Sequence, residues 1–172
     1  MPELLRLNLG SGQRPFAKPW VNVDCQDRWS TDVLSDIRSM PMFKDSSAGI
    51  VVLHQVLEHF GCGEADGVIR ECQRILAPGG SLIVTVPNLL ALVKGWISRR
   101  IDTQIFLTSM YGAYMGDEAD RHRWQYDAMT LDKAMRDSVT EPWREVKPFD
   151  YRQIEGANIA KDWWILGVEA VK

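Results

Sequence analysis

The chain has 172 residues, of which 45% are hydrophobic, and both values are ordinary for one globular domain with a single core. Its formal net charge is -3 and it has no long run of lysine or arginine, which argues against a nucleic acid partner. Its apolar stretches fall short of a membrane span, and the first ten residues fit a strand better than a signal peptide.

The three cysteines, Cys25, Cys62 and Cys72, are an odd number without the spacing of a disulfide framework or a zinc site. They are therefore expected to be reduced thiols in a cytoplasmic protein. The sequence shows neither an internal repeat nor a low-complexity linker, so a single domain over residues 1–172 is expected.

An apolar segment at 5–9 runs into the turn Gly10-Ser11-Gly12, and a second apolar segment ends at Asp24. Glycines in such a turn let the backbone approach a ligand, and an acid at the tip of the next strand can accept hydrogen bonds from both ribose hydroxyls. The pattern predicts a nucleoside-binding edge of a sheet.

The third glycine of the dinucleotide fingerprint is absent, because Pro15 stands near its place. The connection from Gly12 to Trp20 is also shorter than the roughly dozen residues that a full crossover needs. A ligand without a pyrophosphate, such as S-adenosylmethionine, therefore fits this edge better than NAD or FAD.

Further elements follow in a regular order. Residues 32–37 read as a third short strand that ends near Asp36, whose carboxylate could accept the adenine amine while the N–H of Ile37 meets a ring nitrogen. The continuous apolar run 49–54 is typical of a central parallel strand. A helix is expected up to the turn 77–80, and a fifth strand at 81–86.

With these motifs in order, the chain resembles the class I S-adenosylmethionine-dependent methyltransferases, and most closely a small type 11-like group. The resemblance implies a Rossmann-like α/β fold with a mostly parallel seven-stranded sheet and an antiparallel last strand. There are two departures: Asn8 stands where an acid is usual, and the first crossover helices are shortened or absent. The matching segments are 8–12, 20–24, 36–37, 54–60 and 74–88.

The resemblance also implies the cofactor site. Some relatives of the ubiquinone pathway bind a divalent metal through an acid that precedes the Glu-His pair, but Gln55 stands in that position here, so no metal is expected. The cofactor-binding residues expected on this basis are Asn8, Leu9, Gly10, Ser11, Gly12, Asp24, Cys25, Asp36, Ile37, His54, Gln55 and His59.

In the second half, Asn88 is expected to cap a helix that runs to about residue 100, and 104–110 fits another helix. Residues 111–116 read as a mobile loop. Thr130 is expected to cap a third helix, and 143–152 with 163–171 to form the closing antiparallel pair.

Two histidines are candidate general bases. Glu58 and His59 follow the fourth strand, at the edge of the sheet where ligands bind, and His122 lies among aromatic residues. The alternative is that His59 only covers the cofactor, that Glu58 serves the following helix, and that His122 lies in a surface loop.

Residues 101–126 are expected to form a lid over the transferring methyl group. The residues expected to bind the acceptor are Asn88, Tyr111, His122 and Trp124.

Three functions compete. The favoured one is methyl transfer to oxygen of a small-molecule or glycan-type acceptor, because the chain lacks the Asn/Asp-Pro-Pro-aromatic motif of methyltransferases that act on exocyclic amines. The second is a non-catalytic S-adenosylmethionine-binding module or partner subunit. The third, an NAD-dependent oxidoreductase, is disfavoured by Pro15. A homodimer is also expected, because Trp20 and Trp29 could cover a thinly covered sheet face within the chain or across a subunit contact.

Overall fold

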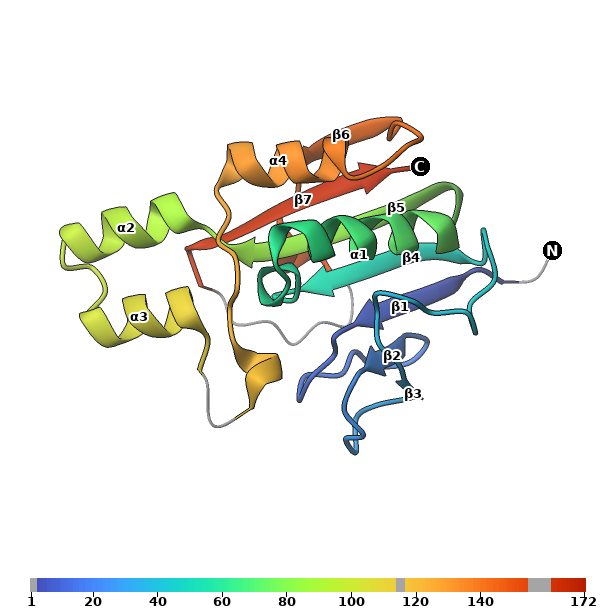
Figure 1. The fold of residues 1–172 in the computed structure, drawn as a ribbon, viewed down its shortest axis with the longest axis horizontal. Helices are drawn as coiled ribbons and strands as arrows, with labels where there is room; N and C mark the ends of the chain where they lie inside the picture. The colour runs from blue at the N-terminus through green and yellow to red at the C-terminus, as the bar shows by residue number, and fades with distance from the viewer. Residues whose placement is uncertain (1–2, 114–116, 155–161) are drawn as a thin grey trace.

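The computed structural model describes residues 3–113, 117–154 and 162–172. Its strands form one seven-stranded sheet in the order β3-β2-β1-β4-β5-β7-β6. The first five strands pair in parallel, whereas β7 is antiparallel to its two neighbours, which confirms the predicted fold class (Figure 1). The strands are β1 (Leu5–Leu9), β2 (Val21–Asp24), β3 (Val33–Leu34), β4 (Ala48–His54), β5 (Leu76–Pro87), β6 (Glu145–Pro148) and β7 (Ile165–Val171).

Helices α1 and α4 lie over one face of the sheet, and α2 and α3 extend past the carboxyl ends of β4 and β5 (Figure 1). Among the described residues, no helix is long and apolar enough to span a bilayer. The helices are α1 (Cys62–Ile75), α2 (Leu89–Ile97), α3 (Thr103–Tyr111) and α4 (Ala128–Asp137), and the single 3-10 turns are η1 (Leu57–His59), η2 (Glu118–Asp120) and η3 (Tyr151–Gln153).

Alternate side chains of the strands enter two different apolar clusters. On β4, Val51 and Leu53 belong to the larger cluster, which includes the buried faces of α1 and α4. Val52 belongs to the smaller cluster on the opposite face. This alternation follows from the period of two in a strand and makes β4 apolar on both faces.

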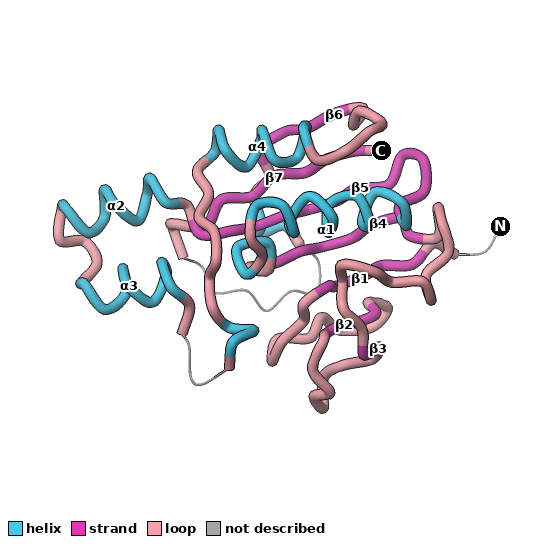
Figure 2. Tube along the Cα trace, viewed as in Figure 1, coloured by secondary structure: helices cyan, strands magenta, loops and turns pink. Residues whose placement is uncertain are grey.

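Loops, not helices, join β1 to β2 and β2 to β3, as predicted, and a loop also joins β3 to β4 (Figure 2). Side chains from these and later loops cover part of the sheet face that crossover helices would otherwise cover. Phe16 and Trp20, from the first loop, pack with Tyr151 and Ile154 on the second face. Trp20 is only 2% exposed, so it covers the sheet within its own chain, whereas Trp29 is 85% exposed. The homodimer stays a prediction.

The predicted bounds of the third, fifth and sixth strands were wrong. The third strand is limited to Val33–Leu34, and a turn follows it in which the Asp36 carboxylate accepts the Arg38 N–H at 2.9 Å. The fifth strand begins at Leu76, which pairs with Ala48 before the register shifts. The sixth strand is limited to Glu145–Pro148, although the Phe149 N–H after it still donates to the Gly167 carbonyl at 2.9 Å.

In the second half, α2 ends at Ile97 instead of residue 100, and Arg99 follows with a φ of 56°. The helix expected to be capped by Thr130 begins earlier, because Asp127 accepts the Thr130 N–H and is the N-cap. The helix at 104–110 is confirmed as α3. Of the loop expected at 111–116, Tyr111 ends α3, and residues 114–116 lie outside the described residues.

Candidate functional site

A cavity of about 360 Å³ opens at the carboxyl ends of the parallel strands. Its volume is within the roughly 300–1,000 Å³ typical of small-ligand pockets, and its position at the strand ends is the usual ligand site of open α/β sheets. Loops after four strands line it, and η2 closes it from the other side. Of the predicted cofactor residues, those in its lining are Gly10, Gly12, Asp24, Cys25, Asp36, Ile37, Gln55 and His59.

The glycine turn has a conformation that other residues rarely adopt. Gly10 has a φ of 66°, and a Cβ atom there would lie 2.7 Å from the Val56 Cγ2 atom. Gly12 has a φ of 52°, with no atom within 4 Å of the place where a Cβ would stand. The first glycine is therefore required by packing and backbone shape, and the second leaves open backbone at the cavity.

Asp24 is buried at the end of β2 and accepts two backbone hydrogen bonds. Its Oδ2 accepts the N–H of Gly12 at 2.8 Å, and its Oδ1 accepts the N–H of Gln26 at 2.9 Å. A carboxylate has about four acceptor positions, so it can still accept hydrogen bonds from a ligand.

Asp36 lies on the same cavity with Arg38, two residues further along the chain. The Arg38 guanidinium binds the Asp36 carboxylate at 2.6 to 3.1 Å and also reaches Glu64 at 2.9 Å. The Arg38 side chain lowers the pKa of Asp36. This edge of the cavity therefore carries an ionised carboxylate that is partly satisfied by the protein.

Gln55 has a φ of 56°, which is unusual for a residue with a side chain. Its buried Nε2 atom has no hydrogen-bond partner among the described residues, although its N–H donates to the Thr85 carbonyl at 2.9 Å. Since buried donors are normally paired, this amide is available to a ligand in the cavity that it lines.

Four predicted cofactor residues lie outside the cavity lining. Asn8 donates to the Asn22 side chain at 2.9 Å inside the sheet, and Leu9 is buried in the core. Ser11 is buried within the turn, and its N–H donates to the Val23 carbonyl at 3.1 Å. His54 points to the opposite side, with its Nδ1 atom 2.7 Å from the Thr85 hydroxyl.

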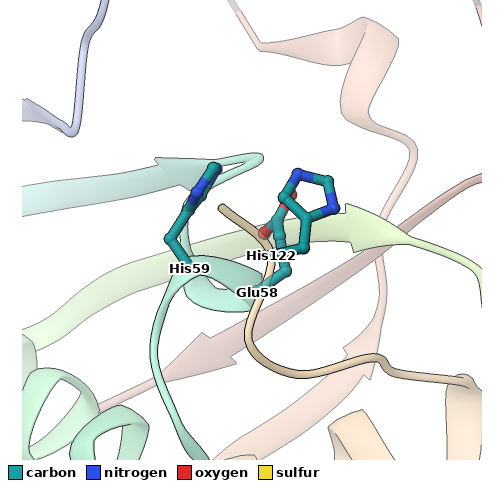
Figure 3. Close-up of side chains that lie close together, drawn as sticks. All are labelled: Glu58, His59 and His122. Carbon is teal, nitrogen blue, oxygen red and sulfur yellow. The ribbon is translucent and has the colours of Figure 1, made fainter. Parts of the chain in front are cut away.

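The three predicted catalytic residues form one cluster beside the cavity. Glu58 and His59 belong to η1, directly after β4, and His122 comes from the segment after η2 (Figure 3). The rings of His59 and His122 are 4.8 Å apart at an interplanar angle of 90°. Their two segments are joined by the Glu58 carbonyl, which accepts the N–H groups of Arg123 at 2.8 Å and Trp124 at 3.1 Å.

A family profile described as a methyltransferase domain matches residues 8–84, from β1 into β5. The matched part contains the cavity-lining residues Gly10, Gly12, Asp24, Asp36 and His59. The chain is a class I S-adenosylmethionine-dependent methyltransferase. S-adenosylmethionine is its methyl donor, and the open backbone at Gly12, the Asp24 carboxylate and the unpaired Gln55 amide suit a nucleoside with an amino acid tail.

Solved structures show the same fold as this methyltransferase over nearly its whole length. A possible histamine N-methyltransferase of Thermotoga maritima has a TM-score of 0.59 at 14% identity, over 100% of this chain and 84% of that one. A methyltransferase of Methanosarcina mazei has a TM-score of 0.59 at 15% identity, over 100% of this chain and 93% of that one. The third is the 1,6-didemethyltoxoflavin-N1-methyltransferase of Burkholderia thailandensis, whose structure contains 1,6-didemethyltoxoflavin and S-adenosylhomocysteine. It has a TM-score of 0.57 at 14% identity, over 98% of this chain and 70% of that one. No curated protein matches the chain.

Burial determines the protonation states of Glu58, His59 and His122. It raises the pKa of Glu58 to about 8, which favours the neutral carboxylic acid near pH 7. It lowers the pKa of His122 to about 4, with a further contribution from His59, and it also lowers the pKa of His59. Both imidazoles are therefore neutral near pH 7, and each has a nitrogen lone pair to offer.

A second cavity of about 330 Å³ is lined by His122 and shares Arg123 with the first cavity. Three of the residues predicted to bind the acceptor, Tyr111, His122 and Trp124, line it together. Asn88 lies elsewhere: its side chain accepts the Ala91 N–H at 3.2 Å at the start of α2. The structure therefore brings together three of the four predicted acceptor residues.

Sequence reasoning missed the residues that face the glycine turn across the first cavity. Those from the second half are Glu118, Ala119, Asp120 and Arg123. Gln26 joins the two walls, since its side chain binds both Asp117 and Arg28. No periodicity in 117–123 signals this contact, whereas Arg38 could have been found from its spacing of two residues after Asp36.

Proposed function

We propose that this methyltransferase transfers a methyl group to an oxygen atom of a small-molecule or glycan-type acceptor. The observation that carries the proposal is the contact between the rings of His59 and His122. His59 lines the cavity that fits the donor and His122 lines the cavity that contains Tyr111 and Trp124. A donor and an acceptor bound in these two cavities would meet at the histidine pair.

The donor cavity offers a separate group for each part of S-adenosylmethionine. Asp24 would accept hydrogen bonds from the ribose. Asp36, which neighbours Ile37, would accept a hydrogen bond from the adenine amine. The Gln55 Nε2 atom would donate to a polar group of the methionine part, since it has no partner among the described residues. Holding donor and acceptor in line contributes on the order of 7–11 kcal/mol in well-oriented reactions.

S-adenosylmethionine supplies an electrophilic methyl group, whose bond to sulfur breaks as the acceptor oxygen bonds to carbon. The acceptor hydroxyl must then lose its proton to a base. His122 is suited to this because its Nδ1–H donates to the Ser109 carbonyl at 2.9 Å, which leaves the lone pair on Nε2. Glu58 lies beside it, and its carboxylate, once ionised, would stabilise the proton after its transfer, whereas His59 opposes a positive charge on His122.

Residues 101–126 would act as the lid of the acceptor site within a single domain of 1–172. In support, α3 contributes Tyr111 to the second cavity, and η2 contributes the far wall of the first. A segment that closes both cavities excludes water from the sulfonium. The rival account is a rigid insertion whose aromatic side chains complete the core.

Small acceptors are supported by the Burkholderia thailandensis neighbour, which has 1,6-didemethyltoxoflavin bound beside S-adenosylhomocysteine. The three free thiols are consistent with a reducing, cytoplasmic environment. Neither a nucleic acid nor a membrane partner is part of the proposal. The exposed Trp29 is the residue that would support a homodimer, and light scattering at high micromolar concentration tests this point.

Two measurements test the proposed function. Calorimetry with S-adenosylmethionine and with NAD should show binding of the first only. A panel of sugars and hydroxylated metabolites, assayed with a labelled methyl donor, should yield at least one O-methylated product. Donor binding without turnover on any acceptor would favour the non-catalytic module or partner subunit. Methylation confined to amines would contradict the oxygen target.

A further inference from the structure

We propose that Glu58, His59 and His122 bind a divalent transition-metal ion. One potential ligand atom from each of the three residues lies within 4.8 Å of the other two (Figure 3). The sequence analysis predicted no metal here, and it could not place His122, which lies more than sixty residues from His59 along the chain. Gln55, which replaces the acid used by metal-binding relatives, is not needed in this arrangement.

In the ranges that the structure describes, the Glu58 carboxylate lacks a partner that would offset the cost of its burial. The residue is 0% exposed, and neither carboxylate oxygen has a hydrogen-bond partner among the described residues. A buried carboxyl group without a partner is costly, and buried charges in proteins are normally paired or bound to metals. No arginine or lysine is paired with Glu58 in the described part of the chain. A cation between Glu58 and the two imidazoles would satisfy it.

The histidines are prepared to act as ligands. The hydrogen bond from the His122 Nδ1–H to the Ser109 carbonyl, at 2.9 Å, fixes the ring and leaves the Nε2 lone pair free. Histidines that bind metals usually donate their other N–H to a carbonyl or carboxylate in this way. The Nδ1 atom of His59 is buried without a partner among the described residues, so this ring also has an unused polar atom.

The donor set selects the kind of ion. Two imidazole nitrogens and one carboxylate suit Zn²⁺, Co²⁺ and Fe²⁺, whereas Mg²⁺ and Ca²⁺ prefer sites made entirely of oxygen. Ligand atoms about 2.1 Å from a tetrahedral ion lie about 3.4 Å apart, so the widest separation of 4.8 Å must shrink on binding. Rotation of the three side chains can supply this change, because η1 and the His122 segment are already held together at the Glu58 carbonyl.

Three protein ligands leave a coordination position open, as in catalytic metal sites. The role of the ion in catalysis rests on the proposed function, in which the acceptor hydroxyl lies beside His122. With the ion bound, His122 would be a ligand and could not accept a proton. The ion would then lower the pKa of the hydroxyl, as metals do for bound water, and the proton would leave to solvent.

The test is titration of the chelator-treated full chain with Zn²⁺, Co²⁺ and Mg²⁺, followed by calorimetry and, for Co²⁺, by visible absorption. We expect one Zn²⁺ or Co²⁺ per chain and no Mg²⁺ at the same concentration. Glu58→Gln and His122→Ala should each weaken Zn²⁺ binding by at least about tenfold. His54→Gln is the matched control, because His54 is the third histidine of the chain and lies outside the cluster; its Zn²⁺ affinity should equal that of the wild type.

Equal Zn²⁺ affinity in the wild type and in both cluster variants would overturn the proposal. If a variant fails to fold without metal, the Co²⁺ spectrum of the wild type decides. A thiolate charge-transfer band would place the ion on Cys25 or Cys62, which are exposed, and would overturn the site. Methyl transfer without metal binding would contradict the metal site but leave the proposed function standing. Metal binding without methyl transfer to any acceptor would contradict the proposed function but leave the metal site standing.

Discussion

The N–H of Gly12 donates a hydrogen bond of 2.8 Å to the Oδ2 atom of Asp24. The acid at the end of β2 therefore closes the turn that follows β1, in addition to facing the donor cavity. The two strongest sequence motifs of the chain are thus one structural unit. A change in either residue is expected to alter both the shape of the turn and the affinity for the donor.

Replacing Asp24 by alanine should weaken S-adenosylmethionine binding by roughly 2–4 kcal/mol, because hydrogen bonds to charged groups contribute about 1.5–3 kcal/mol each. Isothermal titration calorimetry measures this loss. Asp24→Asn is the control for the turn, since its amide oxygen can still accept the Gly12 N–H. Unchanged donor affinity in Asp24→Ala would contradict the assignment of this carboxylate to the ribose.

Replacing Gly10 by alanine should lower both the stability and the donor affinity. The new Cβ atom would lie 2.7 Å from Val56 on a backbone with a φ of 66°. Gly63→Ala is the matched control, because Gly63 lies in α1 with no atom within 4 Å of its would-be Cβ. That change should raise the stability by up to about 1 kcal/mol. Thermal unfolding compares the two variants, and equal effects would refute the special role of Gly10.

The sequence was sufficient to predict a mostly parallel seven-stranded sheet with an antiparallel last strand, and many of the residues that line the donor cavity. Asp24, Asp36 and Gln55 each come at or just after the carboxyl end of a strand, and the ends of parallel strands meet at one edge of a sheet. Residues in the strand interior were harder to place. Asn8 is in the same motif as Gly10, but its side chain binds Asn22 inside the sheet.

The contacts between the two halves of the chain could not be predicted. The approach of His122 to Glu58 depends on how α2, α3 and η2 are placed, and no repeat or spacing in the sequence determines that. Capping was ambiguous for a related reason. Asp127 and Thr130 are both good N-cap residues, and their reciprocal hydrogen bonds decide in favour of Asp127 only in the folded chain.

Replacing Trp20 by alanine should destabilise the protein by about 3–5 kcal/mol, as is typical for a large aromatic residue in a core. Trp20 makes an edge-to-face contact with Phe16 at 5.1 Å and covers the sheet face that lacks helices. Trp29→Ala is the control, because this exposed side chain should change the stability by less than about 0.5 kcal/mol. Urea unfolding of both variants tests this, and a small loss for Trp20→Ala would show that the face is covered otherwise.

Replacing Asp32 by asparagine should reduce the stability in a pH-dependent way. The N–H of Asn22, at 2.8 Å, and the Lys18 ammonium, at 2.9 Å, hold the pKa of Asp32 below its usual range. A carboxylate with a lowered pKa stabilises the fold above its unfolded value and loses this contribution as the pH falls through the folded value. The gap in melting temperature between wild type and variant should therefore be constant above about pH 5 and shrink below about pH 4. A constant gap down to about pH 3 would contradict this origin.

Replacing His122 by alanine tests whether the segment 101–126 acts as a lid on the acceptor or as a structural insertion. His122 lines the second cavity and touches the His59 ring, which faces the donor cavity. A lid role predicts an unchanged melting temperature and donor affinity, with methyl transfer reduced by at least about tenfold, because a base or an ion ligand is lost next to the acceptor. A core role predicts a lower melting temperature with little specific change in turnover. Melting curves, donor calorimetry and single-turnover rates on an identified acceptor separate the two, and equal turnover in wild type and variant would refute the lid assignment for His122.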